Sequence, residues 1–210
     1  MIYTKSDFSG LAQRFRTNLI NSVSGFKSAN LIGTTDSSGK TNLAVFSSVI
    51  HLGADPAAVG LLMRPVTVDR HTYQNIKETG YFTVNHIHRH IIERAHQTSA
   101  RYDKDISEFD ACLLTPEFSA MHPAPYVKES QIKFACTFTE EHTIRLNGTI
   151  FIAGEIIELM LPGEYIQDDG YIDIEAADTV TISGLDSYHS TKRECRLPYA
   201  KPGKDTALLR

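Results

Sequence analysis

The chain has 210 residues, a formal net charge of −4, 41% hydrophobic residues and 22% charged residues. At about 150 residues per domain this length predicts one domain, and the composition excludes a disordered chain. The longest uninterrupted apolar run, Ala57–Met63, is far shorter than a membrane span of about 20 residues. The start lacks a signal peptide's apolar core, and the three cysteines form no recognisable framework. We therefore expect a cytoplasmic protein.

The charge is uneven along the chain. Thr191–Arg210 holds six basic residues and only two acidic ones, so the rest of the chain is acidic. Such a tail can meet an anionic ligand or nucleic acid, but most basic tails are simply solvated. Because a nucleic-acid protein more often has a basic body, we expect no nucleic-acid partner.

The first predicted element is an amphipathic helix over Asp7–Val23, where apolar residues recur at steps of three, four and one, with Ser6 as its cap. Two strands are predicted next, over Ala29–Thr35 and Thr41–Leu52. The turn residues Asp36–Gly39 between them predict a hairpin.

Asp55-Pro56 ends that hairpin, and short strands and helices then alternate before the pattern becomes β-rich. Ile144–Leu161 predicts two strands, or one strand bent at Gly148 or Gly154. The last 40 residues predict irregular structure with one helical turn near Glu175. The other predicted elements are a buried strand over Ala57–Met63, a helix over Arg70–Glu78 ending at Gly80, a strand over Tyr81–Ile87, a helix over His88–Gln97, a loop-rich region over Ser99–Tyr126 and a half-buried strand over Ser130–Thr139.

This order of elements lacks the regular strand–helix alternation of a doubly wound parallel sheet. Neither a G-x-G-x-x-G pattern after the first strand nor a phosphate loop of the G-x-x-x-x-G-K type is present. A closed antiparallel barrel with peripheral helices fits the pattern best.

The segment Arg64–Thr72 lies between a buried strand and the start of a helix. A helix N-terminus offers unpaired N–H groups and a partial positive charge, and guanidinium groups match phosphate oxygens. With Arg64, Arg70, His71 and Thr72 beside it, this segment is a candidate phosphate site. The alternative is a polar turn in which Asp69 caps the helix and pairs with an arginine.

Two serines interrupt the apolar strand around Asn42–Val49. Buried hydroxyl groups need partners, and Ser47 and Ser48 could bind a polar heterocycle together with free backbone N–H groups. Alternatively, both hydroxyls bond to neighbouring backbone.

A histidine cluster comprises His86, His88 and His90, followed by Glu93 and His96. Either a strand or a helix could place three of these side chains together as a zinc site. However, the predicted change from strand to helix falls inside the cluster, so scattered surface histidines are the better interpretation. We predict no metal site.

Taken in order, these pieces resemble the flavin reductase-like family, the FMN-binding split barrels, over about Ala29–Pro198. Each piece is short, and the resemblance rests on their ordered combination. The matching pieces are Asn42-Leu-Ala-Val-Phe-Ser-Ser48, Asp55-Pro56, Val59-Gly-Leu61, Arg70-x-Thr72-x-x-Asn75, Gly80-Tyr-Phe-Thr-Val-Asn85, Ser99-Ala-x-Tyr102, Glu108-Phe109, Gly154-Glu155 and Asp186-Ser-Tyr188.

The resemblance implies a mainly β (α+β) fold, a split antiparallel β-barrel with peripheral helices. It implies a homodimer with one FMN per subunit near the interface. On this basis the chain divides into an N-terminal helical extension (1–28), the FMN-binding split barrel (29–198) and a basic C-terminal tail (199–210).

The resemblance also implies the residues that hold FMN. Ser47, Ser48 and Val49 line the isoalloxazine ring, with Asn42 close by. The phosphate clamp consists of Arg64, Arg70, His71 and Thr72. Tyr188 faces the flavin or the partner subunit.

The implied activity is an NAD(P)H-dependent flavin oxidoreductase, with NADH or NADPH as donor and free flavin or an electron-accepting protein as acceptor. No side chain need act as a nucleophile, so we predict no catalytic residue. Gln131 and Ala135 replace a Pro and a Glu common in the family, so no role is carried over to that strand. Arg89–Tyr126 lacks a clear nicotinamide motif, which weakens the reductase assignment relative to FMN binding. The alternatives are an FMN-binding electron carrier, or a barrel that binds another ligand such as haem.

Overall fold

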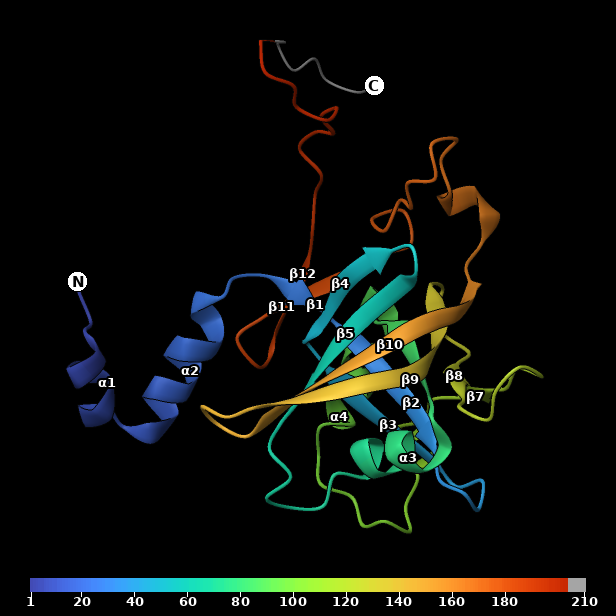
Figure 1. Cartoon of the computed structure of the whole chain (residues 1–210), viewed down its shortest axis with the longest axis horizontal. Helices are drawn as coiled ribbons and strands as arrows, with labels where there is room; N and C mark the ends of the chain where they lie inside the picture. The colour runs from blue at the N-terminus through green and yellow to red at the C-terminus, as the bar shows by residue number, and fades with distance from the viewer. Residues whose placement is uncertain (204–210) are drawn as a thin grey trace.

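The computed structural model describes residues 1–203, so the end of the predicted basic tail lies outside the described residues. A seven-stranded antiparallel sheet forms the body, and it curls into a barrel (Figure 1). This confirms the predicted antiparallel barrel. In spatial order the strands are β3 (Thr41–Phe46), β2 (Asn30–Thr35), β6 (Tyr81–His86), β9 (Lys133–Ile144), β10 (Thr149–Met160), β5 (Ala57–Met63) and β4 (Val49–Ala54).

The strand predicted over Thr41–Leu52 is in fact two strands. β3 and β4 follow one another in the chain but lie at opposite edges of the sheet, joined through Ser47 and Ser48. The prediction of one strand was wrong because the apolar pattern continues across the break. The hydrogen bond from Leu62 N–H to Ser48 O (3.2 Å) extends the β4–β5 pairing into this corner.

The second strand pair, β9 and β10, settles the open alternatives for Ile144–Leu161. β9 ends at Ile144, and a turn through Gly148 leads into β10, so two strands are present. β10 also has an irregularity between Ala153 and Gly154. The predicted strand over Ser130–Thr139 begins later, at Lys133, and is longer than expected.

The central helix α3 (His71–Thr79) agrees with its prediction. It ends at Gly80, whose φ of 78° is the left-handed conformation that favours glycine, and the Gly80 N–H donates to Ile76 O. The predicted helix over His88–Gln97 begins with a 3₁₀ turn. The remaining short helices are η1 (Arg89–Ile91), α4 (Ile92–Gln97), α5 (Glu108–Ala111) and η2 (Gly163–Tyr165).

The last 40 residues contain more β-structure than predicted. β11 (Val180–Ser183) and β12 (Ser187–Ser190) form a small sheet with β1 (Lys27–Ser28). The order is β1-β11-β12, so the C-terminal hairpin pairs with the chain just before β2. These strands are too short for an alternating pattern to predict them. A further pair consists of β7 (Pro116–Glu117) and β8 (Tyr126–Val127).

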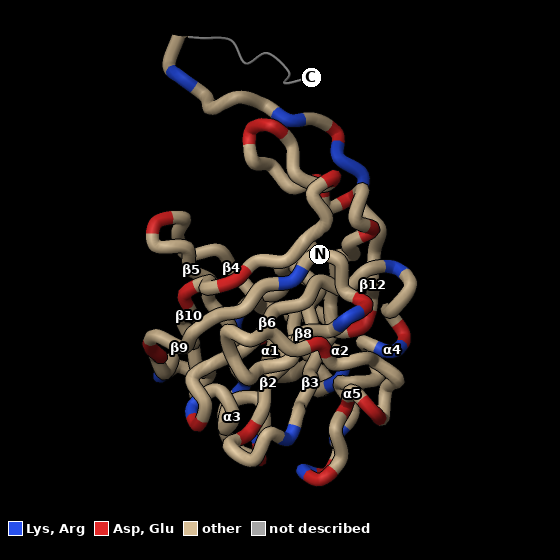
Figure 2. The backbone as a smooth tube through the Cα atoms, turned by 90° about the vertical axis from the view of Figure 1, so that its right-hand side faces the viewer, with Lys and Arg blue, Asp and Glu red and all other residues tan. Residues whose placement is uncertain are grey.

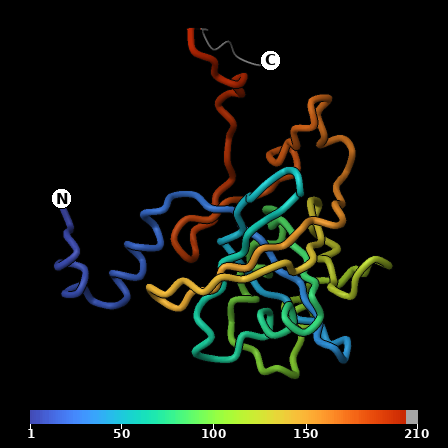
Figure 3. The backbone as a smooth tube through the Cα atoms, viewed as in Figure 1, coloured from blue at the N-terminus to red at the C-terminus, as the bar shows by residue number. Residues whose placement is uncertain are grey.

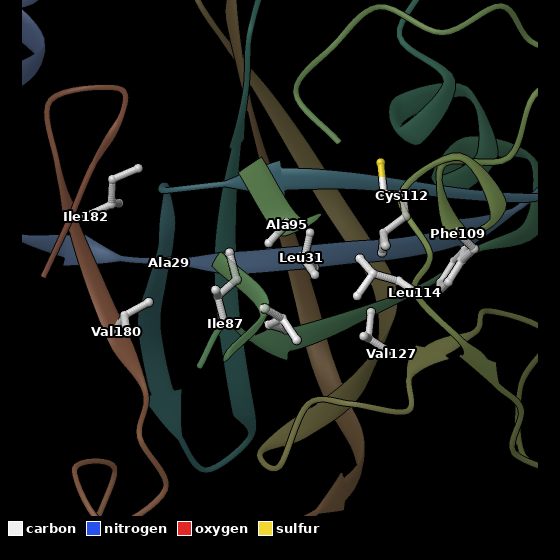
Figure 4. Close-up of a cluster of buried hydrophobic side chains, with 12 residues drawn as sticks. Ala29, Leu31, Ile87, Ala95, Phe109, Cys112, Leu114, Val127, Val180 and Ile182 are labelled. Atoms are coloured by element: carbon white, nitrogen blue, oxygen red, sulfur yellow. The ribbon is translucent and has the colours of Figure 1, made fainter. Parts of the chain in front are cut away.

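Two hydrophobic cores lie on the two faces of the sheet. The barrel core contains Ile32, Val59, Leu61, Met63, Ile76, Phe82, Val84, Phe134, Cys136, Ile150 and Ile152. The side core packs β2 and β3 against η1, α4, α5 and the β11–β12 hairpin (Figure 4), and it contains Ala29, Leu31, Leu43, Ile87, Ile91, Ala95, Phe109, Cys112, Leu114, Val127, Val180 and Ile182.

The N-terminal helix predicted over Asp7–Val23 is two helices, α1 (Lys5–Gly10) and α2 (Gln13–Val23). The cap of α1 is Thr4, not Ser6, because Thr4 and Asp7 form a reciprocal capping box. Neither helix has a buried residue, and both extend away from the barrel (Figure 3).

The C-terminal segment also leaves the body and carries the basic residues noted in the sequence, with acidic residues among them (Figure 2). Its Arg196 pairs with Asp169 (2.6 Å) and lies over the Tyr171 ring. Within residues 1–203, no helix combines the length and apolarity needed to cross a membrane.

Candidate functional site

The edge strand β3 presents an open backbone edge. One side of β3 pairs with β2, and on the other side the Leu43 N–H donates to the Glu108 carboxylate at 3.0 Å. Alternate N–H groups of an antiparallel strand point the same way. The Val45 N–H therefore also points away from β2, on the open side of β3.

The two serines at this corner have different environments. The Ser48 hydroxyl donates to Leu62 O at 2.9 Å, which is the structural alternative raised for both serines. Ser47 has no side-chain hydrogen bond within residues 1–203, and its side chain is half-buried. Ser28 reaches the same corner and donates to Val49 O (3.1 Å). The corner thus has one hydroxyl with a structural role and one that is free.

The loop after β5 ends at the N-terminus of α3. Arg70 is the N-cap, no side chain caps the helix, and Gln74 N–H is the donor to Arg70 O (2.9 Å). The Arg70 Nε is buried without a hydrogen-bond partner. A buried donor without a partner is costly, so this atom is suited to an anion that the chain itself does not supply.

The alternative interpretation of this loop does not hold. Asp69 is exposed, it does not cap α3, and within residues 1–203 it forms no ion pair. Arg64 lies exposed just after β5, while His71 is half-buried at the first position of α3. The loop thus places Arg70 and His71 at the start of α3, whereas Arg64 lies at the opposite end of the loop, next to β5.

Asn42 links the two predicted parts of the site. Its Nδ2 donates to Thr72 Oγ1 (3.0 Å) and to Thr34 Oγ1 (3.3 Å), and all three side chains are buried. Asn75 also donates to Thr34 (3.2 Å). The asparagine amide therefore fixes the start of α3 against β3, which is a supporting role.

Tyr188 lies on β12 and packs against the side core. Its hydroxyl is 3.1 Å from Nδ1 of His96 on α4, and burial, helped by the charge of Asp186, raises the pKa of Tyr188 to about 12. No local pattern pointed to this pairing, because the two residues are 92 positions apart.

Glu108 is a second residue whose place the sequence did not reveal. Its carboxylate is buried on the open edge of β3, and burial raises the pKa of Glu108. The hydrogen bond from the Leu43 N–H acts in the opposite direction and lowers this pKa. Glu108 closes the edge at Leu43, so the open stretch of β3 lies between Leu43 and Ser47.

In the histidine cluster His88 is buried and His86 is half-buried, so the interpretation as scattered surface histidines was wrong for these two. His88 Nε2 contacts Glu129 O (2.7 Å), His90 faces Asp178, and His86 lies beside Thr179. Across residues 1–203 no three His, Cys, Asp or Glu side chains form a group that could hold a metal ion.

Comparison with known proteins identifies the family. The sequence model described as "Flavin reductase like domain" matches residues 23–174.

The chain belongs to the flavin reductase-like family.

A solved structure from Shewanella frigidimarina NCIMB 400, a candidate flavin reductase with a split barrel domain, is 51% identical to this flavin reductase-like protein. The match covers 95% of this chain and all of that one, with a TM-score of 0.92. The predicted split-barrel fold class is thereby confirmed.

Two more distant similarities are to a solved structure and to a curated sequence. The 2-nitrobenzoate 2-nitroreductase of Pseudomonas fluorescens is 21% identical, with a TM-score of 0.80 and coverage of 98% of this chain and 100% of that one. A curated Aquifex aeolicus (strain VF5) protein without an assigned role is 23% identical over 168 residues, covering 79% of this chain and 85% of its own.

Proposed function

We propose that this flavin reductase-like protein binds FMN and reduces it with NADH or NADPH. The observation that carries the proposal is the buried, unpartnered Nε of Arg70 at the uncapped N-terminus of α3. A phosphate group supplies the acceptor that this atom lacks, and the helix end favours its negative charge. The donor set therefore fits the phosphate of FMN.

In this proposal Arg64, Arg70, His71 and Thr72 hold the phosphate. Ser47, Ser48 and Val49 line the ring, with the free Ser47 hydroxyl as a polar contact. At about 3.3 Å per residue, β3 covers roughly 16 Å from Asn42 to Ser47, which suits an extended ligand with a phosphate at one end and a ring at the other.

Bound FMN supplies hydride and electron transfer, chemistry that the side chains alone do not offer. The chain binds and orients it. The outward N–H of Val45 is a fixed donor near the ring end, where it stabilises negative charge on a bound ligand. No nucleophile is required, and Cys136 is buried in the barrel core, where burial raises its pKa.

The visible spectrum of the purified protein, before and after anaerobic addition of NADH or NADPH, tests the proposal. We expect a two-band flavin spectrum that bleaches rapidly, and the faster nucleotide is the donor. A flavin spectrum that neither nucleotide bleaches would instead indicate an electron carrier. A colourless protein that fails to take up added FMN would contradict the site assignment.

We also propose that the protein is a homodimer. α2 has no buried residue, and Phe15, Ile20 and Val23 are 50%, 45% and 77% exposed. On edge strand β4, Ile50 and Leu52 are 46% and 43% exposed. Apolar residues on both a projecting helix and a sheet edge fit a second copy of this chain, because a two-fold interface uses the same surfaces on each subunit.

A further inference from the structure

His96 and Tyr188 form a polar pair beside the side core. The Tyr188 hydroxyl is 3.1 Å from His96 Nδ1, and the two rings are nearly perpendicular, at 87° with centroids 5.7 Å apart. His96 comes from α4 and Tyr188 from β12, so the fold alone brings them together. Both side chains are half-buried.

The direction of this hydrogen bond follows from the donor and acceptor strengths of the two groups. The phenol O–H is a strong donor and an imidazole nitrogen is a better acceptor than a phenol oxygen, so the Tyr188 hydroxyl donates towards Nδ1. The neutral imidazole then carries its own proton on Nε2, because the partner of one ring nitrogen decides the state of the other. Within residues 1–203 the Nε2 atom of His96 has no partner, so its N–H is free to donate.

The elements that carry the pair pack against β3 and the side core. α4 packs against β3, and Val45, Ile92, Tyr102 and Tyr188 are all half-buried against the side core. Ala95, the neighbour of His96, lies close to Leu31, which pairs with Val45 (Figure 4). The helix that carries His96 therefore packs against the strand whose open stretch lies between Leu43 and Ser47.

We infer that His96 donates a hydrogen bond from Nε2 to a ring carbonyl or ring nitrogen of bound flavin, and that Tyr188 is a positioning residue that fixes the His96 tautomer. The inference rests on the proposed function, because it needs a flavin at the β3 edge. It also changes the expected role of Tyr188, whose hydroxyl is already committed to His96.

Two near-isosteres of histidine separate contact with the ligand from a purely structural role. A glutamine amide nitrogen reaches the position of Nε2, whereas an asparagine amide reaches only that of Nδ1. We expect His96→Asn and His96→Ala to weaken riboflavin binding about tenfold, the effect of one hydrogen bond, and His96→Gln to stay within about threefold of the unmodified chain. Quenching of flavin fluorescence measures these affinities. Riboflavin is the probe because it lacks the phosphate.

A structural role predicts the reverse order, because His96→Asn keeps the bond to Tyr188 and His96→Gln loses it. Riboflavin binding by His96→Asn that equals that of the unmodified chain would therefore overturn the inference while leaving the proposed function intact. An unmodified chain that binds neither FMN nor riboflavin would overturn the proposed function, and the inference with it.

The tautomer provides a second readout that needs no flavin. ¹⁵N chemical shifts of the His96 ring should show a single form protonated at Nε2. In Tyr188→Phe they should show a mixture of tautomers, with riboflavin affinity reduced about threefold. An unchanged tautomer in Tyr188→Phe would contradict the positioning role of Tyr188.

Discussion

Arg70 buries its Nε without a partner at the start of α3. For Arg70→Ala we expect a loss of about 1.5–3 kcal/mol in FMN binding, the range for a hydrogen bond to a charged group. Riboflavin affinity should hardly change, because riboflavin carries no phosphate. The exposed Arg14 on α2 offers a matched control, and Arg14→Ala should bind both flavins normally. Equal losses for FMN and riboflavin would argue against a phosphate contact.

Gly33 on β2 allows the segment before β8 to lie directly on the sheet. A Cβ added there would collide with the Pro125 carbonyl oxygen and with Thr83 Oγ1, which themselves form a 2.6 Å hydrogen bond. We expect Gly33→Ala to lower the free energy of unfolding by about 2–3 kcal/mol, as overpacking does. Urea unfolding measures this. Gly163→Ala, whose added Cβ meets open space, should change stability by less than about 0.5 kcal/mol.

At the scale of elements, the passage from β6 into η1 buries titratable groups. Burial lowers the pKa of His86 to about 4 and also lowers the pKa of His88. Between pH 6.5 and pH 4 the unfolded chain therefore binds protons that the folded chain does not, and stability falls as the pH falls through this window.

We expect His86 to contribute about 2 kcal/mol of this loss, less than the full shift allows because its side chain keeps some contact with solvent. Urea unfolding at several pH values should show a shallower pH dependence for His86→Asn than for the unmodified chain. His142→Asn is the control, since His142 is 62% exposed. If the free energy of unfolding depends on pH in His86→Asn as it does in the unmodified chain, the prediction is refuted.

At the scale of the whole molecule, we expect dimerisation to depend on the exposed apolar side chains of α2. Replacing Phe15 and Val23 together with serine should raise the dimer dissociation constant at least about 100-fold, since each buried apolar side chain contributes about 1.5–3 kcal/mol. Sedimentation velocity measures this, with Arg14→Ser as the polar control on the same helix. If the unmodified chain is monomeric at concentrations on the order of tens of micromolar, α2 has another role.

Local patterns were enough to predict several elements. The buried strand β5 and the helix α3, with its terminal Gly80, were found because their apolar periods and end signals lie within a few residues. The same reasoning failed at Ser47, where the apolar pattern runs on although the chain crosses from one sheet edge to the other. It also could not show that α2 leaves its apolar face uncovered.

The sequence by itself determined the β-rich class, the order of most strands and the cationic loop before α3. Only the tertiary structure decided which polar groups meet: Asn42 with Thr72, Glu108 with the Leu43 N–H, and His96 with Tyr188. The physical reason is that a strand or helix signal is local, whereas these contacts join residues 30 to 92 positions apart. Strand register and the packing of two cores set those contacts, and no period in the sequence encodes them.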